Sequence, residues 1–87
     1  MAGSTIGITV RYFAAARAAA GSDSEQLTAP SGATVGDLVD GLGGRSQELA
    51  RVLLRCSFLC DGVAVRDQAQ LLDAGNTIDV LPPFAGG

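Results

Sequence analysis

Thr34-Val35-Gly36-Asp37-Leu38 opens the stretch of sequence that decides the fold, which continues as Val39-Asp40-Gly41-Leu42 and ends in Gly43-Gly44. Its apolar residues have helical spacing, and Thr34 followed three positions later by Asp37 resembles a capping box with Asp in place of Glu. No Lys-Ser/Thr pair follows the glycines, so they do not form a phosphate loop. We therefore expect the main core helix here, ended by Gly41, Gly43 and Gly44.

The sequence before this helix predicts a hairpin-like unit. Ile6, Ile8, Val10 and Tyr12 alternate with other residues in the two-residue period of a strand with one face against a core. The alanine-rich run 14–20, stopped by Gly21, predicts a short helix with Arg17 exposed. Residues 25–27 predict a second strand that pairs with the first, and Pro30-Ser31-Gly32 breaks the chain.

The sequence after the main helix predicts one more helix and three strands. Ser46 can cap a helix whose apolar stripe is Leu49, Val52 and Leu53. Asp61-Gly62, between residues 57–60 and 63–65, is typical of a two-residue type I′ hairpin turn. In the connection 68–76 we expect Leu71 and Leu72 to face inward, and Ile78 and Val80 alternate with Asp79 and Leu81 in a last strand.

This order of elements predicts an α+β domain, in which a mixed sheet packs against the main helix in a ubiquitin-like (β-grasp) roll. We expect the domain to span residues 1–81. Pro82 and Pro83 lack the N–H needed for a sheet ladder, so they should end the last strand and direct a flexible, protruding C-terminal tail, residues 82–87, away from the domain. The tail ends in Gly86-Gly87, which can enter a cleft too narrow for any side chain.

Composition narrows the function classes. The chain has 87 residues, which suffice for one core, and its net charge of −3 includes six arginines without a basic cluster. We therefore expect protein partners and no nucleic acid. Since no segment is long and apolar enough for a membrane span and the N-terminus does not resemble a signal peptide, we expect a cytoplasmic protein without a membrane partner.

The chain offers little chemistry of its own. It contains neither histidine nor lysine, which are the usual general base near neutral pH and the usual Schiff-base nucleophile. Cys56 and Cys60 lack the companions of a zinc site, so we expect no metal. They are too far apart in a strand for a disulfide, and core packing with both thiols reduced is the simpler interpretation. A reactive thiol is the alternative.

With these motifs in place, the chain resembles the ubiquitin-fold sulfur carriers, and among them the small subunit of molybdopterin synthase (the MoaD family). The resemblance covers nearly the whole chain. It depends on Ile8-Thr9-Val10-Arg11-Tyr12-Phe13-Ala14, on the start of the main helix at residues 34–38, and on residues 72–78. The most specific element is Leu81-Pro82-Pro83-Phe84-Ala85-Gly86-Gly87. Asp61-Gly62 stands where such carriers commonly have Asn-Gly, and Leu81 where an aromatic residue is frequent.

The resemblance implies a carrier subunit of a sulfurtransferase, with the catalytic groups in its partner. An E1-like adenylyltransferase would use ATP and magnesium to adenylate Gly87, and a sulfur donor protein would then give a thiocarboxylate. In the large subunit of molybdopterin synthase, this group would donate sulfur to cyclic pyranopterin monophosphate during molybdenum cofactor biosynthesis. Gly86 and Ala85 would thread the partner's cleft. Phe84, Pro83 and Pro82 would contact the partner, although Phe84 could equally fold back on the sheet.

Two other interpretations stay open at this point. The same tail could deliver sulfur to the thiazole pathway, to cysteine formation or to tRNA thiolation. Alternatively, the chain could be a ubiquitin-like interaction module that is never activated. Independent catalysis is the weakest alternative, because the sequence contains no combination of base and nucleophile.

Overall fold

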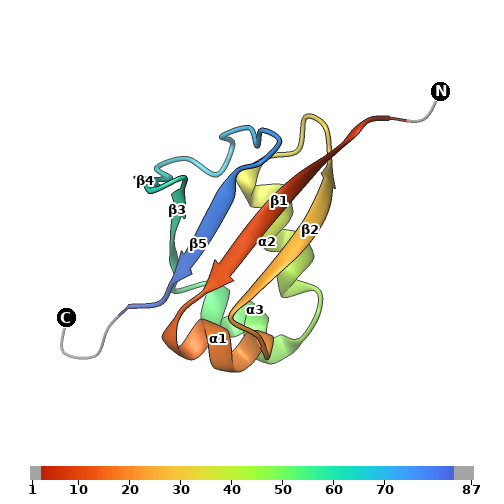
Figure 1. Cartoon of the computed structure of the whole chain (residues 1–87). Helices are drawn as coiled ribbons and strands as arrows, with labels where there is room; N and C mark the ends of the chain where they lie inside the picture. Colours follow the sequence, from red (N-terminus) through yellow and green to blue (C-terminus); the bar gives the residue numbers. More distant parts are fainter. Residues whose placement is uncertain (1–2, 84–87) are drawn as a thin grey trace.

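The structure, a computed structural model, describes residues 3–83 and consists of one five-stranded sheet with three helices. Along the chain the elements are β1 (Thr5–Tyr12), α1 (Ala14–Ala20), β2 (Ser24–Pro30), α2 (Val35–Gly43), α3 (Gln47–Leu53), β3 (Ser57–Cys60), β4 (Val63–Ala64) and β5 (Thr77–Leu81). Figure 1 shows their arrangement. The predicted α+β, β-grasp fold with a mixed sheet is confirmed.

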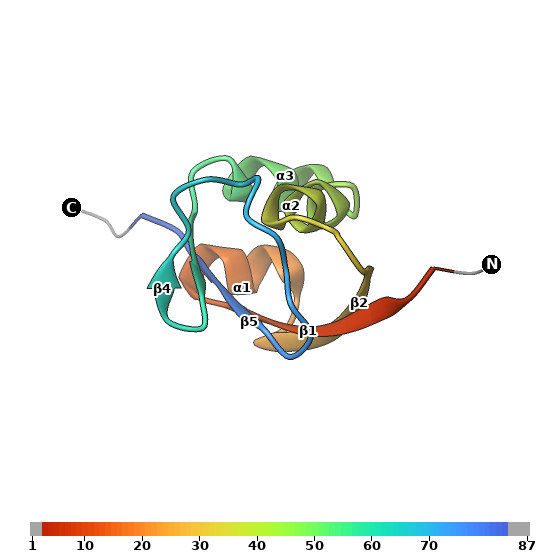
Figure 2. The same ribbon diagram turned by 90° about the horizontal axis from the view of Figure 1, so that it is seen from above.

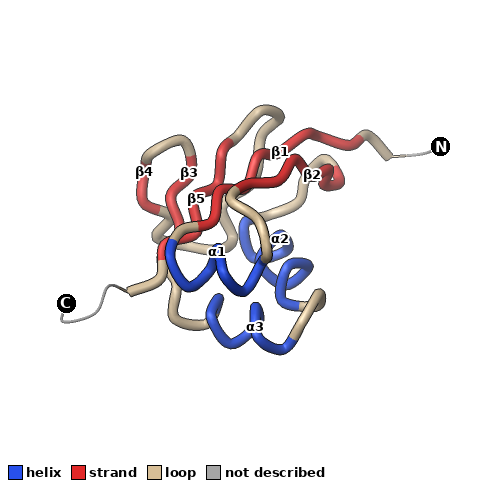
Figure 3. The backbone as a smooth tube through the Cα atoms, turned by 60° about the horizontal axis from the view of Figure 1, so that its bottom comes forward, coloured by secondary structure: helices blue, strands red, loops and turns tan. Residues whose placement is uncertain are grey.

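The strand order in the sheet is β2-β1-β5-β3-β4. The last strand in the sequence, β5, is the central one: it runs parallel to β1 and antiparallel to β3. All three helices lie on one face of the sheet (Figures 2 and 3), and the other face carries no helix. Residues 82–87 therefore follow the strand that pairs with a neighbouring strand along each of its edges.

The core lies between the sheet and the helices. It is built from the alternate positions of β1 and β5 and from one face of each helix. Its fully buried members include Ile8, Val10, Val35, Ile78 and Val80. Burying an aliphatic side chain of this size stabilises the fold by about 1.5–3 kcal/mol. The alternation predicted for β1 and β5 thus identifies the residues that hold the two strands against the helices.

The predicted capping box begins α2. The backbone N–H of Asp37 donates to Thr34 Oγ1 at 3.1 Å, and the N–H of Thr34 donates to Asp37 Oδ2 at 2.9 Å. The helix α3 is capped as predicted, since Ser46 Oγ accepts from the N–H of Leu49 at 3.0 Å. Both helices therefore start at the residues that their sequences indicate.

Two predicted turns also have the expected backbone. Gly21 follows α1 in the left-handed region, at φ 81°, and donates its N–H to the carbonyl of Arg17. Asp61 and Gly62 both have positive φ, 51° and 84°, as a type I′ turn requires. The second strand, predicted at residues 25–27, is longer than expected and pairs with β1 from Thr5 to Arg11.

Two expectations are wrong in detail. Gly41 and Gly43 lie inside α2 and only Gly44 caps it. A helical glycine costs about 1 kcal/mol relative to alanine, and the burial of Leu42 outweighs that cost. Leu71 is exposed while Leu72 is buried, because adjacent residues of an extended segment point to opposite sides. Asp79 alternates with Ile78 and Val80 as expected, and it is nevertheless buried, because neighbouring side chains cover it on the outer face of the sheet.

The capping box yields a stability prediction. Thr34→Ala removes the acceptor of the Asp37 N–H, and we expect the free energy of unfolding to fall by about 1 kcal/mol, measured by urea denaturation. Ser31→Ala is the control, because the described structure gives this exposed hydroxyl no side-chain hydrogen bond. Equal stability of the Thr34 variant and the wild type would show that the cap contributes nothing.

Candidate functional site

The candidate site is the C-terminal end of β5, where the chain leaves the sheet. The Val80 carbonyl accepts a backbone hydrogen bond from the Phe13 N–H at 3.3 Å, so the junction between β1 and α1 lies beside the C-terminal end of β5. Pro82 is buried and Pro83 is exposed. The predicted site residues Phe84, Ala85, Gly86 and Gly87 lie outside the described residues, and their roles stay predictions, as does a separate tail at 82–87.

Pro82 is buried in this structure, and its predicted contact with a partner stays a prediction. Together with Ala15 of α1 and Val52 of α3, Pro82 lines a hollow on the helix side of the strand end. Its ring is therefore packed against the helices and forms part of the lining of this hollow. Pro83 is the proline whose ring a partner could reach directly.

The open face of the sheet carries an ion pair next to this strand end. The Nε and Nη2 atoms of Arg11 donate to the two carboxylate oxygens of Asp79 at 2.6 and 2.9 Å. These hydrogen bonds raise the pKa of Arg11. The Asp79 side chain is only 8% exposed, because Arg11 and Leu59 flank it on the neighbouring strands. The Arg11 guanidinium also lies 5.6 Å from the centroid of the Phe13 ring, within cation–π distance.

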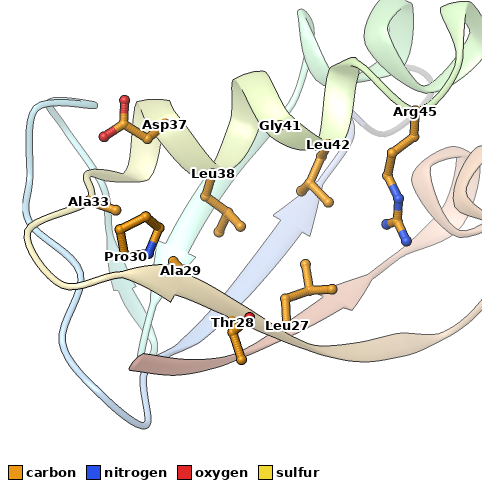
Figure 4. Close-up of a pocket in the computed structure, with 10 residues that line it drawn as sticks. All are labelled: Leu27, Thr28, Ala29, Pro30, Ala33, Asp37, Leu38, Gly41, Leu42 and Arg45. Carbon is orange, nitrogen blue, oxygen red and sulfur yellow. The ribbon is translucent and has the colours of Figure 1, made fainter. Parts of the chain in front are cut away.

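A second hollow lies between the edge strand β2 and α2 (Figure 4). Its volume is about 380 Å³, and its lining is mostly apolar, with Leu27 and Ala29 from the strand and Leu38 and Leu42 from the helix. Arg45 lies at one end of it, as Figure 4 shows. No pattern in the sequence indicates this hollow.

Arg45 does not offer a free charge to that hollow, because it is held by Glu25 and Tyr12. Its Nη1 and Nη2 atoms donate to the Glu25 carboxylate at 2.7 and 2.6 Å, and the Tyr12 hydroxyl donates to the same carboxylate at 2.9 Å. We call these three residues the tyrosine cluster. It joins β1, β2 and the segment between α2 and α3, so its role in the described structure is to fasten the edge strand.

The tyrosine cluster shifts the pKa of its members. Burial, followed by the hydrogen bond to Glu25, raises the pKa of Tyr12 to about 12. The hydrogen bonds from Arg45 hold the pKa of Glu25 below its usual range. Sequence reasoning missed this cluster, because its members lie up to 33 positions apart and only the pairing of β1 with β2 brings Tyr12 near Glu25.

The two thiols have the properties expected of core residues. Cys60 is buried, Cys56 is half-buried, and both are free. Burial raises the pKa of each thiol, and the Cys56 Sγ is 3.2 Å from the carbonyl oxygen of Val52. A thiol with a raised pKa is mostly protonated at neutral pH and is a weak nucleophile. Within residues 3–83, no group of three or more histidine, cysteine or acidic side chains could hold a metal ion.

No helix within residues 3–83 has the length and apolar character that crossing a membrane requires.

Comparison with known families identifies the chain. The model of the ThiS family matches residues 10–87, which is most of the sequence. The chain belongs to the ThiS family. The resemblance to the ubiquitin-fold sulfur carriers that the sequence indicated is thereby confirmed.

The chain is similar to proteins of two kinds, a small archaeal modifier protein and a molybdopterin converting factor subunit. The chain is 34% identical to small archaeal modifier protein 3 of Haloferax volcanii, over 92% of this chain and 98% of that protein. Its structure is similar to that of a putative molybdopterin converting factor, subunit 1, from Pyrococcus furiosus, with a TM-score of 0.82 and 26% identity over 91% of this chain and 99% of the other.

A second similar structure comes from an assembly. It is the complex of subunits 1 and 2 of the molybdopterin-converting factor from Helicobacter pylori, with a TM-score of 0.71 and 21% identity over 94% of this chain and 100% of the matched chain. At this identity, the similarity establishes the fold. Taken together, the comparisons make this protein a ubiquitin-fold sulfur carrier or small modifier of the ThiS family.

The tyrosine cluster yields a titration prediction. Tyr12 is the only tyrosine and the chain has no tryptophan, so the ultraviolet absorbance of the phenolate reports this group alone. We expect a midpoint near pH 12. Because the folded-state pKa is raised above the unfolded value of 10.0, the stabilisation is present below pH 10 and is lost as the pH rises toward 12.

The variant Glu25→Gln tests the cause of that shift. It removes the carboxylate that disfavours the phenolate but keeps the burial, so the midpoint should fall yet stay above the unfolded value. Glu48→Gln, on the exposed start of α3, is the matched control and should leave the midpoint unchanged. A titration midpoint of wild-type Tyr12 at the unfolded value of 10.0 would rule out the cluster as described.

Proposed function

We propose that this protein is the sulfur carrier subunit of molybdopterin synthase. An E1-like adenylyltransferase adenylates the Gly87 carboxylate with ATP and magnesium, and a sulfur donor protein supplies the sulfur of a thiocarboxylate. Docked on the large subunit of the synthase, the thiocarboxylate donates sulfur to cyclic pyranopterin monophosphate in molybdenum cofactor biosynthesis. A cytoplasmic location belongs to the same proposal.

The observation that carries the proposal is the extent of the family match, which continues past the last strand through Gly86 and Gly87. The P. furiosus molybdopterin converting factor subunit, similar in fold over nearly the whole chain, supports the molybdopterin pathway. The H. pylori complex of subunits 1 and 2 supports a large-subunit partner for a protein with this fold.

The chemistry explains why other proteins must act on Gly87. A terminal carboxylate has a pKa of about 3.5, so it is ionised at neutral pH and its carbon is a poor electrophile. Adenylation makes AMP the leaving group, which a sulfur nucleophile can displace. The chain itself supplies no histidine or lysine for this work. It is therefore a non-catalytic carrier, and the partners provide the catalytic groups.

The fold fixes the position of the strand that precedes the C-terminal tail. The strand that leads to the tail, β5, is paired along both edges, and Ile78 and Val80 anchor it in the core. A partner that binds the domain thus fixes the point from which the tail starts, and positioning of this kind supplies much of an enzymatic barrier reduction. Gly86 has no side chain and Ala85 only a methyl group, so both suit a narrow cleft.

A second candidate function is that of a small protein modifier. It is favoured by the 34% identity to the H. volcanii protein that carries this description. The activated Gly87 acyl group would then be transferred to an amine of a target protein. Both candidates share the adenylation step and differ in the acceptor.

Intact-mass spectrometry tests the proposal. The purified chain is incubated with the adenylating enzyme encoded in the same genome, ATP, magnesium and a sulfur source. We expect the mass of the chain to increase by the difference between sulfur and oxygen, and fragmentation to place the change on Gly87. Recovery of the unmodified mass would contradict a sulfur carrier, and a covalent adduct with another protein would favour the modifier.

Gly86→Ala tests the narrow passage. A methyl group at position 86 should displace the reacting carbon, and a misplacement of about 1 Å can reduce a rate on the order of 10²-fold. The substitution lies beyond β5, so we expect the midpoint of thermal unfolding to stay at the wild-type value. Removal of Gly87 is the negative control. Normal thiocarboxylate formation by Gly86→Ala would show that the passage admits a side chain.

A further inference from the structure

The hollow on the helix side of the strand end has the features of a docking site. Its volume is about 490 Å³. It is lined by residues of α3 and the segment that follows it, by one residue of α1, and by the prolines where the chain leaves β5: Arg51, Val52, Leu54, Arg55, Ala15, Pro82 and Pro83. We call this hollow the α3 groove. It adjoins the residues that lead to the tail.

The α3 groove exposes apolar surface to solvent. Leu54, which caps the end of α3, is 87% exposed, the largest exposure among the large apolar side chains that are exposed in the described part of the chain. Pro83 is exposed as well, and Val52 is half-buried. Leu54 and Pro83 thus present exposed apolar surface in one hollow, which an apolar side chain of a partner can cover.

The groove is also positively charged on an otherwise acidic protein. Three of the six arginines, at positions 11, 17 and 45, pair with carboxylates. Arg51 and Arg55, on either side of Leu54, have no carboxylate within 4.0 Å among residues 3–83. The net charge of the chain is −3, so this local pair of cations favours a partner surface that carries carboxylates.

The length of residues 84–87 limits how far from Pro83 the active site of a partner enzyme can lie. Residues 84–87 extend at most about 14 Å from Pro83 to Gly87, at about 3.5 Å per residue. An enzyme that acts on the Gly87 carboxylate must therefore bring its active-site opening within this distance of Pro83. Its surface around the opening then meets the residues next to Pro83, which include the α3 groove.

We propose that the α3 groove docks the enzyme that adenylates Gly87, through a segment in which an apolar side chain covers Leu54 and flanking carboxylates pair with Arg51 and Arg55. The proposal rests on the activation of Gly87 proposed above. It applies to the sulfur carrier and to the modifier alike, because adenylation precedes both.

Steady-state kinetics of adenylation test the groove. The full chain is the varied substrate of the adenylating enzyme from the same genome, and pyrophosphate release is the readout. For Arg51→Glu combined with Arg55→Glu, we expect KM to rise about tenfold and kcat to stay within about twofold, because these side chains affect docking and do not touch the reacting atoms. Leu54→Ser should raise KM in the same way.

Matched controls separate the groove from a general charge effect. Arg55→Glu alone is compared with Arg66→Glu, an exposed arginine that does not line the groove and has no carboxylate within 4.0 Å among the described residues. Only Arg55→Glu should raise KM, and added salt should raise the wild-type KM toward that of the variant. Circular dichroism and the midpoint of thermal unfolding verify that each variant is folded.

Failure of the groove is distinguishable from failure of the proposed function. If the enzyme does not adenylate the wild-type chain, the activation of Gly87 is refuted. If it adenylates the wild type and the groove variants with equal KM, the activation stands and docking in the α3 groove is refuted. An equal rise of KM for Arg66→Glu and Arg55→Glu would also refute the groove, because it would mean that only overall charge matters.

Discussion

The pairing of β5 between β1 and β3 is the constraint on which the rest of the structure depends. This strand is last in the sequence and central in the sheet, so it joins the β2-β1 half of the sheet to the β3-β4 half. Ile78 and Val80 contribute fully buried side chains on its inner face, and on its outer face Asp79 receives both hydrogen bonds of Arg11. Each face of the strand is thereby fixed, and so is the point from which residues 82–87 start.

Local signals predicted most of the fold. The alternation in β1, the Thr34 and Asp37 capping box and the Asp61-Gly62 turn act within a few residues, and the structure contains all three. Predictions failed where tertiary packing opposes local preference, as at Gly41, where the burial of Leu42 keeps the helix intact. The ion pair of Arg11 with Asp79 spans 68 positions, so it could be found only by placing the first and last strands in register.

The candidate site was predictable in part for the same reason. The sequence indicates the tail residues as candidates, because Gly86-Gly87 after two prolines is a local pattern, and their roles stay predictions. The burial of Pro82 and the α3 groove were not, since both depend on how α1 and α3 pack against the strand end. Family membership adds the carrier or modifier chemistry. The two proposed functions differ in the acceptor to which an activated Gly87 would transfer its group.

Under the proposed activation of Gly87, the absence of lysine and the burial of the thiols would have a consequence for the chain itself. An acyl-adenylate reacts with any accessible amine or thiolate, and its own domain is the nearest source of both. Here no side-chain amine exists, Cys60 is buried, and burial disfavours the thiolate of Cys56. If Gly87 is activated as proposed, the side chains of the domain would offer its acyl group no lysine amine and little thiolate, so copies of this sequence would not be linked to one another through lysine.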